Sequence, residues 1–302
     1  MVGTASAKST IRRLALIAAF GCGAIAHAHA ATGIVVLRDD LHRTVVVPRD
    51  PQRVITLLPS LTETVCALGA CNRLVATGDF DDWPPSVRGL PKVGGLDDVN
   101  VERIVALRPD LVLMSSSQRV GARLGQLGVV SFALETDRYA DIARTVSRVG
   151  ALLGLPDRAA ALNARIRDAV QAVSATVRAH RAGTGLKVYF EVGPGPYAAG
   201  PDSYIGELLT MLGARNIVAA RLGAFPLLNP EYVVRRDPDV IFTSRTDAGH
   251  LADRPGWSQI RAVREHHICT FPDAVRDTVV RPGPRVADGM RAIAACLDQV
   301  RS

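Results

Sequence analysis

The residues of this chain best suited to act on another molecule are aromatic side chains in loops. Aromatic residues make up only 5% of the chain, so their positions carry information. Four of them stand within two residues of a Gly or Pro, outside any periodic segment: Phe80, Trp83, Tyr197 and Phe225. Rigid loops expose side chains that a regular helix or strand would bury, although each residue is also suited to a core. As a set they predict flat apolar walls for a large planar ligand.

Two arginines are candidates for charged contacts at the same site. Arg281 lies in a Pro-rich turn before the last expected helix, and Arg245 directly follows an expected strand. Both are equally consistent with solvated surface charges. Catalytic motifs such as GxSxG, HExxH or a P-loop are not found in the sequence, and no nucleophile is paired with a base. The sequence therefore predicts a binding protein that is not an enzyme and carries no cofactor.

A pattern that occurs twice must position these side chains. The first copy reads Leu68-Gly69-Ala70, then Asn100-Val101-Glu102, then Pro109-Asp110 before an apolar run. The second reads Leu212-Gly213-Ala214, then Asn229-Pro230-Glu231, then Pro238-Asp239 before another. Each copy predicts an Asn-capped helix followed by a turn into a buried strand. The repeat predicts two lobes of similar build.

Glu102 and Glu231 occupy equivalent places in the two copies. A carboxylate in the first turn of a helix is favoured by the helix dipole and needs no other partner. Two symmetric, exposed carboxylates would also suit two arginine pockets on a pseudo-symmetric partner.

Alternating strand and helix patterns predict an α/β fold with mainly parallel sheets. The expected elements are a hairpin at 34–37 and 44–47, strands at 53–58, 111–114 and 129–133, and helices at 119–127 and 137–153. Ser60-x-x-Glu63 predicts a capping box that opens a helix ending near Gly69.

Residues 156–180 have apolar side chains at steps of three and four, which predicts one long helix. We expect this helix to join the two lobes. The predicted boundaries are an N-terminal lobe at 31–153, a connecting backbone helix at 154–182 and a C-terminal lobe at 183–302.

Residues 1–30 are predicted to be a secretory leader. Three basic residues precede an apolar stretch at 14–26, and Ala28-His29-Ala30 offers a cleavage site. The apolar stretch is too short to span a bilayer. Lipid anchoring at Cys22 is not expected, because the bulky Phe20 departs from the usual attachment sequence. The mature protein is predicted to be periplasmic.

Charge and cysteine content bear on three further questions: nucleic-acid binding, disulfides and metal sites. The formal net charge is +7, without a Lys/Arg run interleaved with aromatics, so nucleic acid is not predicted. Cys66 and Cys71 flank an expected chain reversal, and they are predicted either to form a disulfide or to be two separately buried thiols. No CxxC motif accompanies them, and His266-His267 is better explained as a polar turn, so no metal site is predicted.

The chain resembles the periplasmic substrate-binding proteins of cobalamin, haem and ferric-siderophore ABC importers over essentially all of 33–302. The resemblance is carried by Arg53–Ser60, Asp82-Trp83-Pro84-Pro85, Asn100–Asp110 and Arg281-Pro282-Gly283-Pro284-Arg285. It implies a helical-backbone binding protein, acting as a monomer, that delivers its ligand to an inner-membrane permease dimer. It also implies that Glu102 and Glu231 bind permease arginines and that Phe80, Tyr197, Phe225, Asp277 and Arg281 face the ligand.

The likeness is strongest to the cobalamin-binding members, with a few departures. Two cleft positions that are Trp in those members are Leu96 and Ser115 here. The usual partner of the C-terminal cysteine falls near Met211, which leaves Cys296 without its family partner and counts against a disulfide there. Cobalamin is the predicted cargo, and haem or a ferric siderophore on the same scaffold is the alternative. A periplasmic metallo-enzyme or metal-transfer protein is the alternative from another class.

Overall fold

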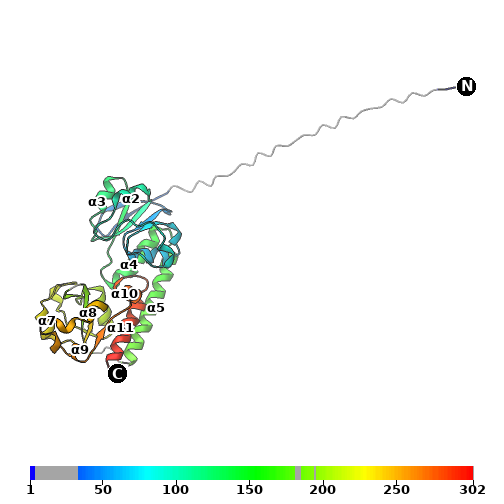
Figure 1. Ribbon diagram of the computed structural model, residues 1–302. Helices are drawn as coiled ribbons and strands as arrows, with labels where there is room; N and C mark the ends of the chain where they lie inside the picture. Colours follow the sequence, from blue (N-terminus) through cyan, green and yellow to red (C-terminus); the bar gives the residue numbers. More distant parts are fainter. Residues whose placement is uncertain (4–32, 181–184, 194, 302) are drawn as a thin grey trace. The chain divides into compact units, whose positions relative to one another are not determined.

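The computed structural model describes residues 1–3, 33–180, 185–193 and 195–301 (Figure 1). The predicted leader lies outside these residues, apart from its first three. Within the part that the structure describes, no helix is both long and apolar enough to cross a membrane.

The described fold begins with the predicted hairpin. Strand β1 (Ile34–Arg38) pairs antiparallel with β2 (Thr44–Pro48). The Asp39 carboxylate holds the turn, because it accepts hydrogen bonds from the backbone N–H of Arg43 at 2.8 Å and from the Arg43 guanidinium at 2.8 and 2.6 Å.

The first sheet is entirely parallel. Its strands are β3 (Val54–Thr56), β4 (Leu74–Thr77), β5 (Leu111–Ser115) and β6 (Ser131–Leu134), in the order β4-β3-β5-β6. Every residue of β3, β5 and β6 is buried, as expected for a sheet with both faces covered.

The second sheet is mainly parallel. Its strands are β7 (Lys187–Gly193), β8 (Tyr197–Ala198), β9 (Arg215–Asn216), β10 (Val240–Phe242) and β11 (Ile268–Cys269). Their order is β11-β10-β7-β8, with β9 also paired to β7, and β8 runs antiparallel. The predicted fold class is therefore confirmed.

The sequence repeat corresponds to a structural repeat. Asn100 and Asn229 cap their helices, each side chain accepting a backbone N–H at 2.8 Å. The aspartate of each Pro-Asp turn then holds the start of a neighbouring strand. Asp110 accepts from the Arg53 backbone N–H at 2.8 Å, and Asp239 accepts from the Lys187 backbone N–H at 2.7 Å.

Helices surround the sheets. They are α1 (Pro59–Ala67), α2 (Val101–Ala106), α3 (Gly121–Gln126), α4 (Tyr139–Leu152), α5 (Pro156–His180), α6 (Tyr204–Met211), α7 (Pro230–Arg236), α8 (Arg245–Ala248), α9 (Arg261–Arg264), α10 (Asp273–Val280) and α11 (Val286–Arg301). The 25-residue α5 confirms the predicted long helix and buries its apolar stripe from Leu162 to Val177. It runs beside α11 (Figure 1). The predicted lobe boundaries stay a prediction.

Two local predictions were wrong. The expected capping box is absent from α1, because this helix begins at Pro59 with Leu58 as its N-cap, and Ser60 makes no cap hydrogen bond. The Glu63 carboxylate binds arginines from the other end of the chain instead. Cys296, which lacks its family partner near Met211, forms a disulfide with Cys269, although that absence counted against one. The fold brings the end of β11 beside α11, a proximity that spacing along the sequence does not reveal. Of the two alternatives for Cys66 and Cys71, the structure contains the disulfide.

Candidate ligand-binding site

A cavity of about 980 Å³ lies among loops that follow the strands of both sheets and the segment from α10 to α11. Ligands of open parallel sheets bind where the carboxyl ends of strands leave such a crevice. Six of the nine residues proposed from sequence for ligand contact line it: Phe80, Leu96, Phe225, Arg245, Asp277 and Arg281.

Exposed apolar side chains line part of the cavity. Phe80 is 62% exposed, Phe225 is 50% exposed and Leu96 is 45% exposed. Large apolar side chains left this accessible within a concave site gain free energy when a ligand covers them. The site is therefore suited to a ligand with broad apolar faces.

A second group of aromatics lines the cavity and was not predicted from the sequence. Phe190 in β7 stacks on Phe242 in β10 with ring centroids 5.1 Å apart, and Phe271 contacts Phe242 at 5.7 Å. Their place in or just after strands suggested ordinary core residues. The usable indication was their position at the carboxyl ends of neighbouring parallel strands.

Three proposed contact residues are not among those that line the cavity: Trp83, Ser115 and Tyr197. The Trp83 ring lies under the Arg285 guanidinium, 4.8 Å from the ring centroid. Ser115 is buried, and its hydroxyl is 2.8 Å from that of Ser117. Tyr197 is 43% exposed in the short strand β8.

Arg281 lines the cavity, but its guanidinium is engaged within the protein. It donates to Asp82 at 2.8 Å, to Asp277 at 2.8 Å and to Glu63 at 3.2 Å. It also donates to the backbone carbonyl of Phe80 at 3.1 Å. Burial favours a higher pKa for Asp82, but the hydrogen bond from Arg281 and the nearby positive charges together lower the pKa below its ordinary value. Arg281 therefore fixes the loop that carries Phe80.

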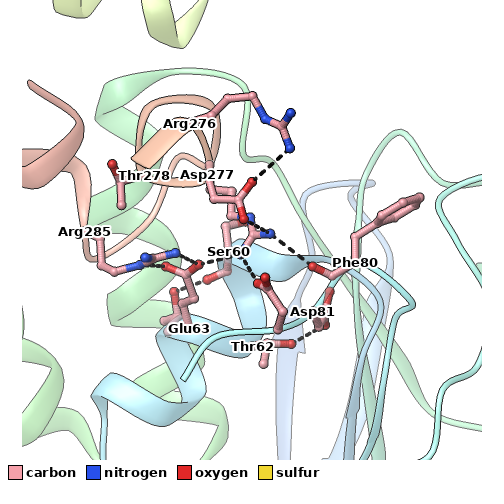
Figure 2. Close-up of polar contacts among 12 residues, drawn as sticks. Ser60, Thr62, Glu63, Phe80, Asp81, Arg276, Asp277, Thr278 and Arg285 are labelled. Carbon is pink, nitrogen blue, oxygen red and sulfur yellow. Dashed lines mark hydrogen bonds and ion pairs between the residues drawn. The ribbon is translucent and has the colours of Figure 1, made fainter. Parts of the chain in front are cut away.

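Arg285 completes this arrangement from the start of α11. Its guanidinium donates to Glu63 at 2.8 and 2.5 Å, and Glu63 is nearly fully buried. Figure 2 shows Arg285 pointing at Glu63 on α1. We call the five charged residues Glu63, Asp82, Asp277, Arg281 and Arg285 the Glu63 cluster. It connects α1, the loop at 79–85 and the α10–α11 segment, which are far apart in the sequence.

The charges around the cavity are mostly negative. Seven lining residues are acidic (Asp79, Asp82, Asp137, Glu191, Asp247, Asp273 and Asp277), and three are basic (Arg245, Arg276 and Arg281). Arg276 pairs with Asp273 at 3.1 Å and with Asp277 at 3.7 Å. Arg281 is also paired internally, and Arg254, which does not line the cavity, pairs with Glu191 at 2.6 Å. Carboxylates still outnumber arginines when Arg254 is counted, so the net field of this cavity disfavours an anionic ligand.

Comparison with known proteins identifies the family of this chain. The model of the family described as periplasmic binding protein matches residues 54–275. The chain belongs to the periplasmic binding protein family. It is 30% identical to a cobalamin-binding protein of Halobacterium salinarum, over 89% of this chain and 76% of that protein. It is 28% identical to the uncharacterized ABC transporter substrate-binding lipoprotein YvrC of Bacillus subtilis, over 86% of this chain and 84% of that protein.

Solved structures agree with the fold. The periplasmic heme-binding protein RhuT from Roseiflexus sp. RS-1, in apo form, superimposes with a TM-score of 0.74 at 22% identity, covering 83% of this chain and 99% of that one. Members of the periplasmic binding protein family bind ligands and are not enzymes. The metallo-enzyme alternative is therefore excluded.

Glu102 and Glu231, the proposed docking residues, lie in the first turns of α2 and α7. Both are exposed, and Glu231 has only a loose ion pair with Arg235 at 3.6 Å. Neither residue lines the cavity. Their carboxylates are therefore accessible for contacts with another protein.

Proposed function

We propose that this protein is the substrate-binding protein of an ABC importer and that its cargo is a corrinoid. It would be exported to the periplasm, take up its ligand in the cavity and deliver it to an inner-membrane permease. The observation that carries the choice of cargo is the excess of carboxylates around the cavity, where two of the three lining arginines, Arg276 and Arg281, are already paired.

The chemistry of the candidate cargoes differs at their edges. A corrinoid carries neutral carboxamide side chains, whose N–H groups donate to carboxylates. Haem carries two propionates, and ferric catecholate complexes are anionic. Both would meet repulsion in a carboxylate-rich cavity. The exposed faces of Phe80 and Phe225 suit the broad apolar faces of a macrocycle.

The side chains around the cavity also disfavour haem coordination. Among the described lining residues, none is His, Cys or Met, and the one tyrosine, Tyr204, is only 3% exposed. Axial ligation of haem iron uses such side chains. The relative from Halobacterium salinarum that is named a cobalamin-binding protein supports the corrinoid cargo independently.

Haem stays the second candidate because of Arg245. This exposed arginine lines the cavity and, among the described contacts, makes no ion pair. Its guanidinium could form a charge-assisted hydrogen bond with a haem propionate.

Isothermal titration of the exported protein with cyanocobalamin, and in parallel with hemin, tests the cargo. We expect saturable one-to-one binding of cyanocobalamin with sub-micromolar affinity, and hemin binding that is weaker or absent. Tight hemin binding accompanied by a shift of the Soret band, without heat from cyanocobalamin, would show that the corrinoid assignment is wrong.

Docking to the permease is proposed to use Glu102 and Glu231. We expect the double substitution Glu102→Ala with Glu231→Ala to abolish corrinoid uptake by cells, because arginines on the permease would lose both partners. Ligand affinity should be unchanged, since neither residue lines the cavity. Asp157→Ala with Asp168→Ala, which removes two exposed carboxylates of α5, is the matched control. Normal uptake by the first double variant would refute the docking assignment.

A further inference from the structure

Two buried hydroxyls beside the cavity have no hydrogen-bond partner among the described residues. They are the Ser60 Oγ atom and the Tyr204 hydroxyl. Ser60 is 2% exposed and Tyr204 is 3% exposed, and both residues line the cavity. Removing a hydroxyl from water without giving it a partner is unfavourable, so such groups call for an explanation.

The two residues approach the cavity from separate parts of the chain. Ser60 lies in the first turn of α1, and Tyr204 is the first residue of α6. Ser60 packs against the backbone of Gly283, where an added Cβ would lie 3.4 Å from the Ser60 Cβ. Figure 2 shows Ser60 and Glu63 on the same helix, close to the segment that carries Asp277 and Arg285.

Tyr204 lies close enough to Glu63 for the Glu63 charge to affect its ionisation. Burial, with the nearby Glu63 charge as a smaller cause, raises the pKa of Tyr204 above its ordinary value. The phenol therefore stays protonated and neutral at physiological pH. Ser60 and Tyr204 thus bring two neutral hydroxyls to the edge of the Glu63 cluster.

The neighbouring charged groups already have partners. Both oxygens of Glu63 accept hydrogen bonds from Arg285, and Arg281 contacts three carboxylates and one backbone carbonyl. A ligand that displaced these contacts would leave buried charges unpaired, at high cost. Ser60 and Tyr204 take part in none of these ion pairs, so a hydrogen bond to either hydroxyl would break none of them.

We propose that Ser60 and Tyr204 form a hydrogen-bonding subsite for an uncharged carboxamide at the edge of the ligand. This inference rests on the proposed corrinoid cargo and adds the residues that recognise one of its amides. A hydroxyl both donates and accepts, and a carboxamide offers an N–H donor and a carbonyl acceptor. In the same place a carboxylate would meet a net negative charge, since Glu63, Asp82 and Asp277 outnumber Arg281 and Arg285.

The test is titration of cyanocobalamin into Ser60→Ala, Tyr204→Phe and the double variant, with urea unfolding of each ligand-free protein. Each single substitution should weaken affinity about 3- to 10-fold, the worth of one neutral hydrogen bond. Ligand-free stability should stay equal or rise, because each change removes a buried hydroxyl without a partner. Two variants are used so that a folding defect in one leaves the other informative.

Ser174→Ala is the matched control. The Ser174 hydroxyl is also buried without a partner among the described residues, but it lies on α5 and does not line the cavity. Its removal should leave affinity unchanged. Wild-type affinity in both Ser60→Ala and Tyr204→Phe would overturn the subsite while the proposed cargo stands. Failure of the wild-type protein to bind cyanocobalamin would overturn the cargo, and the subsite with it.

Discussion

Among the loops that follow the first sheet, Asp81 is a carboxyl group whose pKa the fold raises strongly. It is 1% exposed, the Thr62 hydroxyl donates to its carboxylate, and its other oxygen has no partner among the described residues. Burial raises the pKa of Asp81 from 3.8 to about 7, against the opposing hydrogen bond from Thr62 and the charge of Lys92. Since the pKa is higher in the folded state, the folded protein holds this proton more tightly than the unfolded chain.

The sign of the pH effect follows from this difference. The contribution of Asp81 to stability is fully present below its unfolded pKa near 4 and is lost as pH rises towards 7. We expect Asp81→Asn, which mimics the neutral acid, to become more stable relative to wild type by about 1 to 4 kcal/mol between pH 4 and pH 8. Urea unfolding of both proteins at four pH values measures the difference. A difference that is constant with pH would show that Asp81 ionises normally.

The loop at 79–85 is held by elements that are remote in sequence. Arg285 does not line the cavity, yet it binds Glu63 with two nitrogens and covers the Trp83 ring. Glu63 in turn accepts from Arg281, which holds the Phe80 carbonyl. Arg285 is thus a positioning residue for the exposed Phe80 ring and does not itself contact the ligand.

We expect Arg285→Lys to lower stability by about 1 to 3 kcal/mol, because lysine keeps the charge but not the two-point contact. Corrinoid affinity should fall several-fold as the loop loses its fixed position. Arg43→Lys is the control, since it disrupts a similar two-nitrogen pair, with Asp39, that does not line the cavity. It should lower stability without changing affinity. Equal affinity losses in both variants would mean that Arg285 acts only through global stability.

The same elements show where sequence reasoning succeeds and where it stops. Asn100 and Asn229 act locally, through hydrogen bonds within one helical turn, and their caps could be predicted. Ser60 and Glu63 have the same local pattern as a capping box, but Glu63 binds Arg281 and Arg285, 218 and 222 residues away. A long-range ion pair overrode a local cap. Only the folded chain reveals such a competition.

On the scale of the whole molecule, the architecture was the most predictable feature, because the sequence pattern that specifies it occurs twice. The equivalent turns at Asp110 and Asp239 fix both sheets through the same backbone contacts. The cavity lies where the two copies and the C-terminal segment meet, so its lining depends on contacts that neither copy contains alone. Among the residues proposed from sequence for ligand contact, Phe80 and Phe225 line the cavity, whereas Trp83, Ser115 and Tyr197 do not.

The two disulfides are expected to contribute unequally to the stability of the whole chain. Cys269–Cys296 closes a segment with a sequence separation of 27, whereas Cys66–Cys71 closes one of 5. The longer loop restricts the unfolded chain more, so its removal should cost about 3 to 4 kcal/mol, against about 2 kcal/mol for the shorter. The larger cost also reflects what the bond joins, since Cys269 ends β11 and Cys296 lies on α11, which packs along α5.

Urea unfolding of Cys269→Ser with Cys296→Ser, and of Cys66→Ser with Cys71→Ser, measures both costs in the purified protein. Each double substitution removes both sulfurs of a pair, so that no free thiol can form a mixed disulfide. The ordering of the two costs is the prediction. A larger loss for the Cys66–Cys71 pair would mean that local order around the end of α1, and not the entropy of the unfolded chain, decides the contribution.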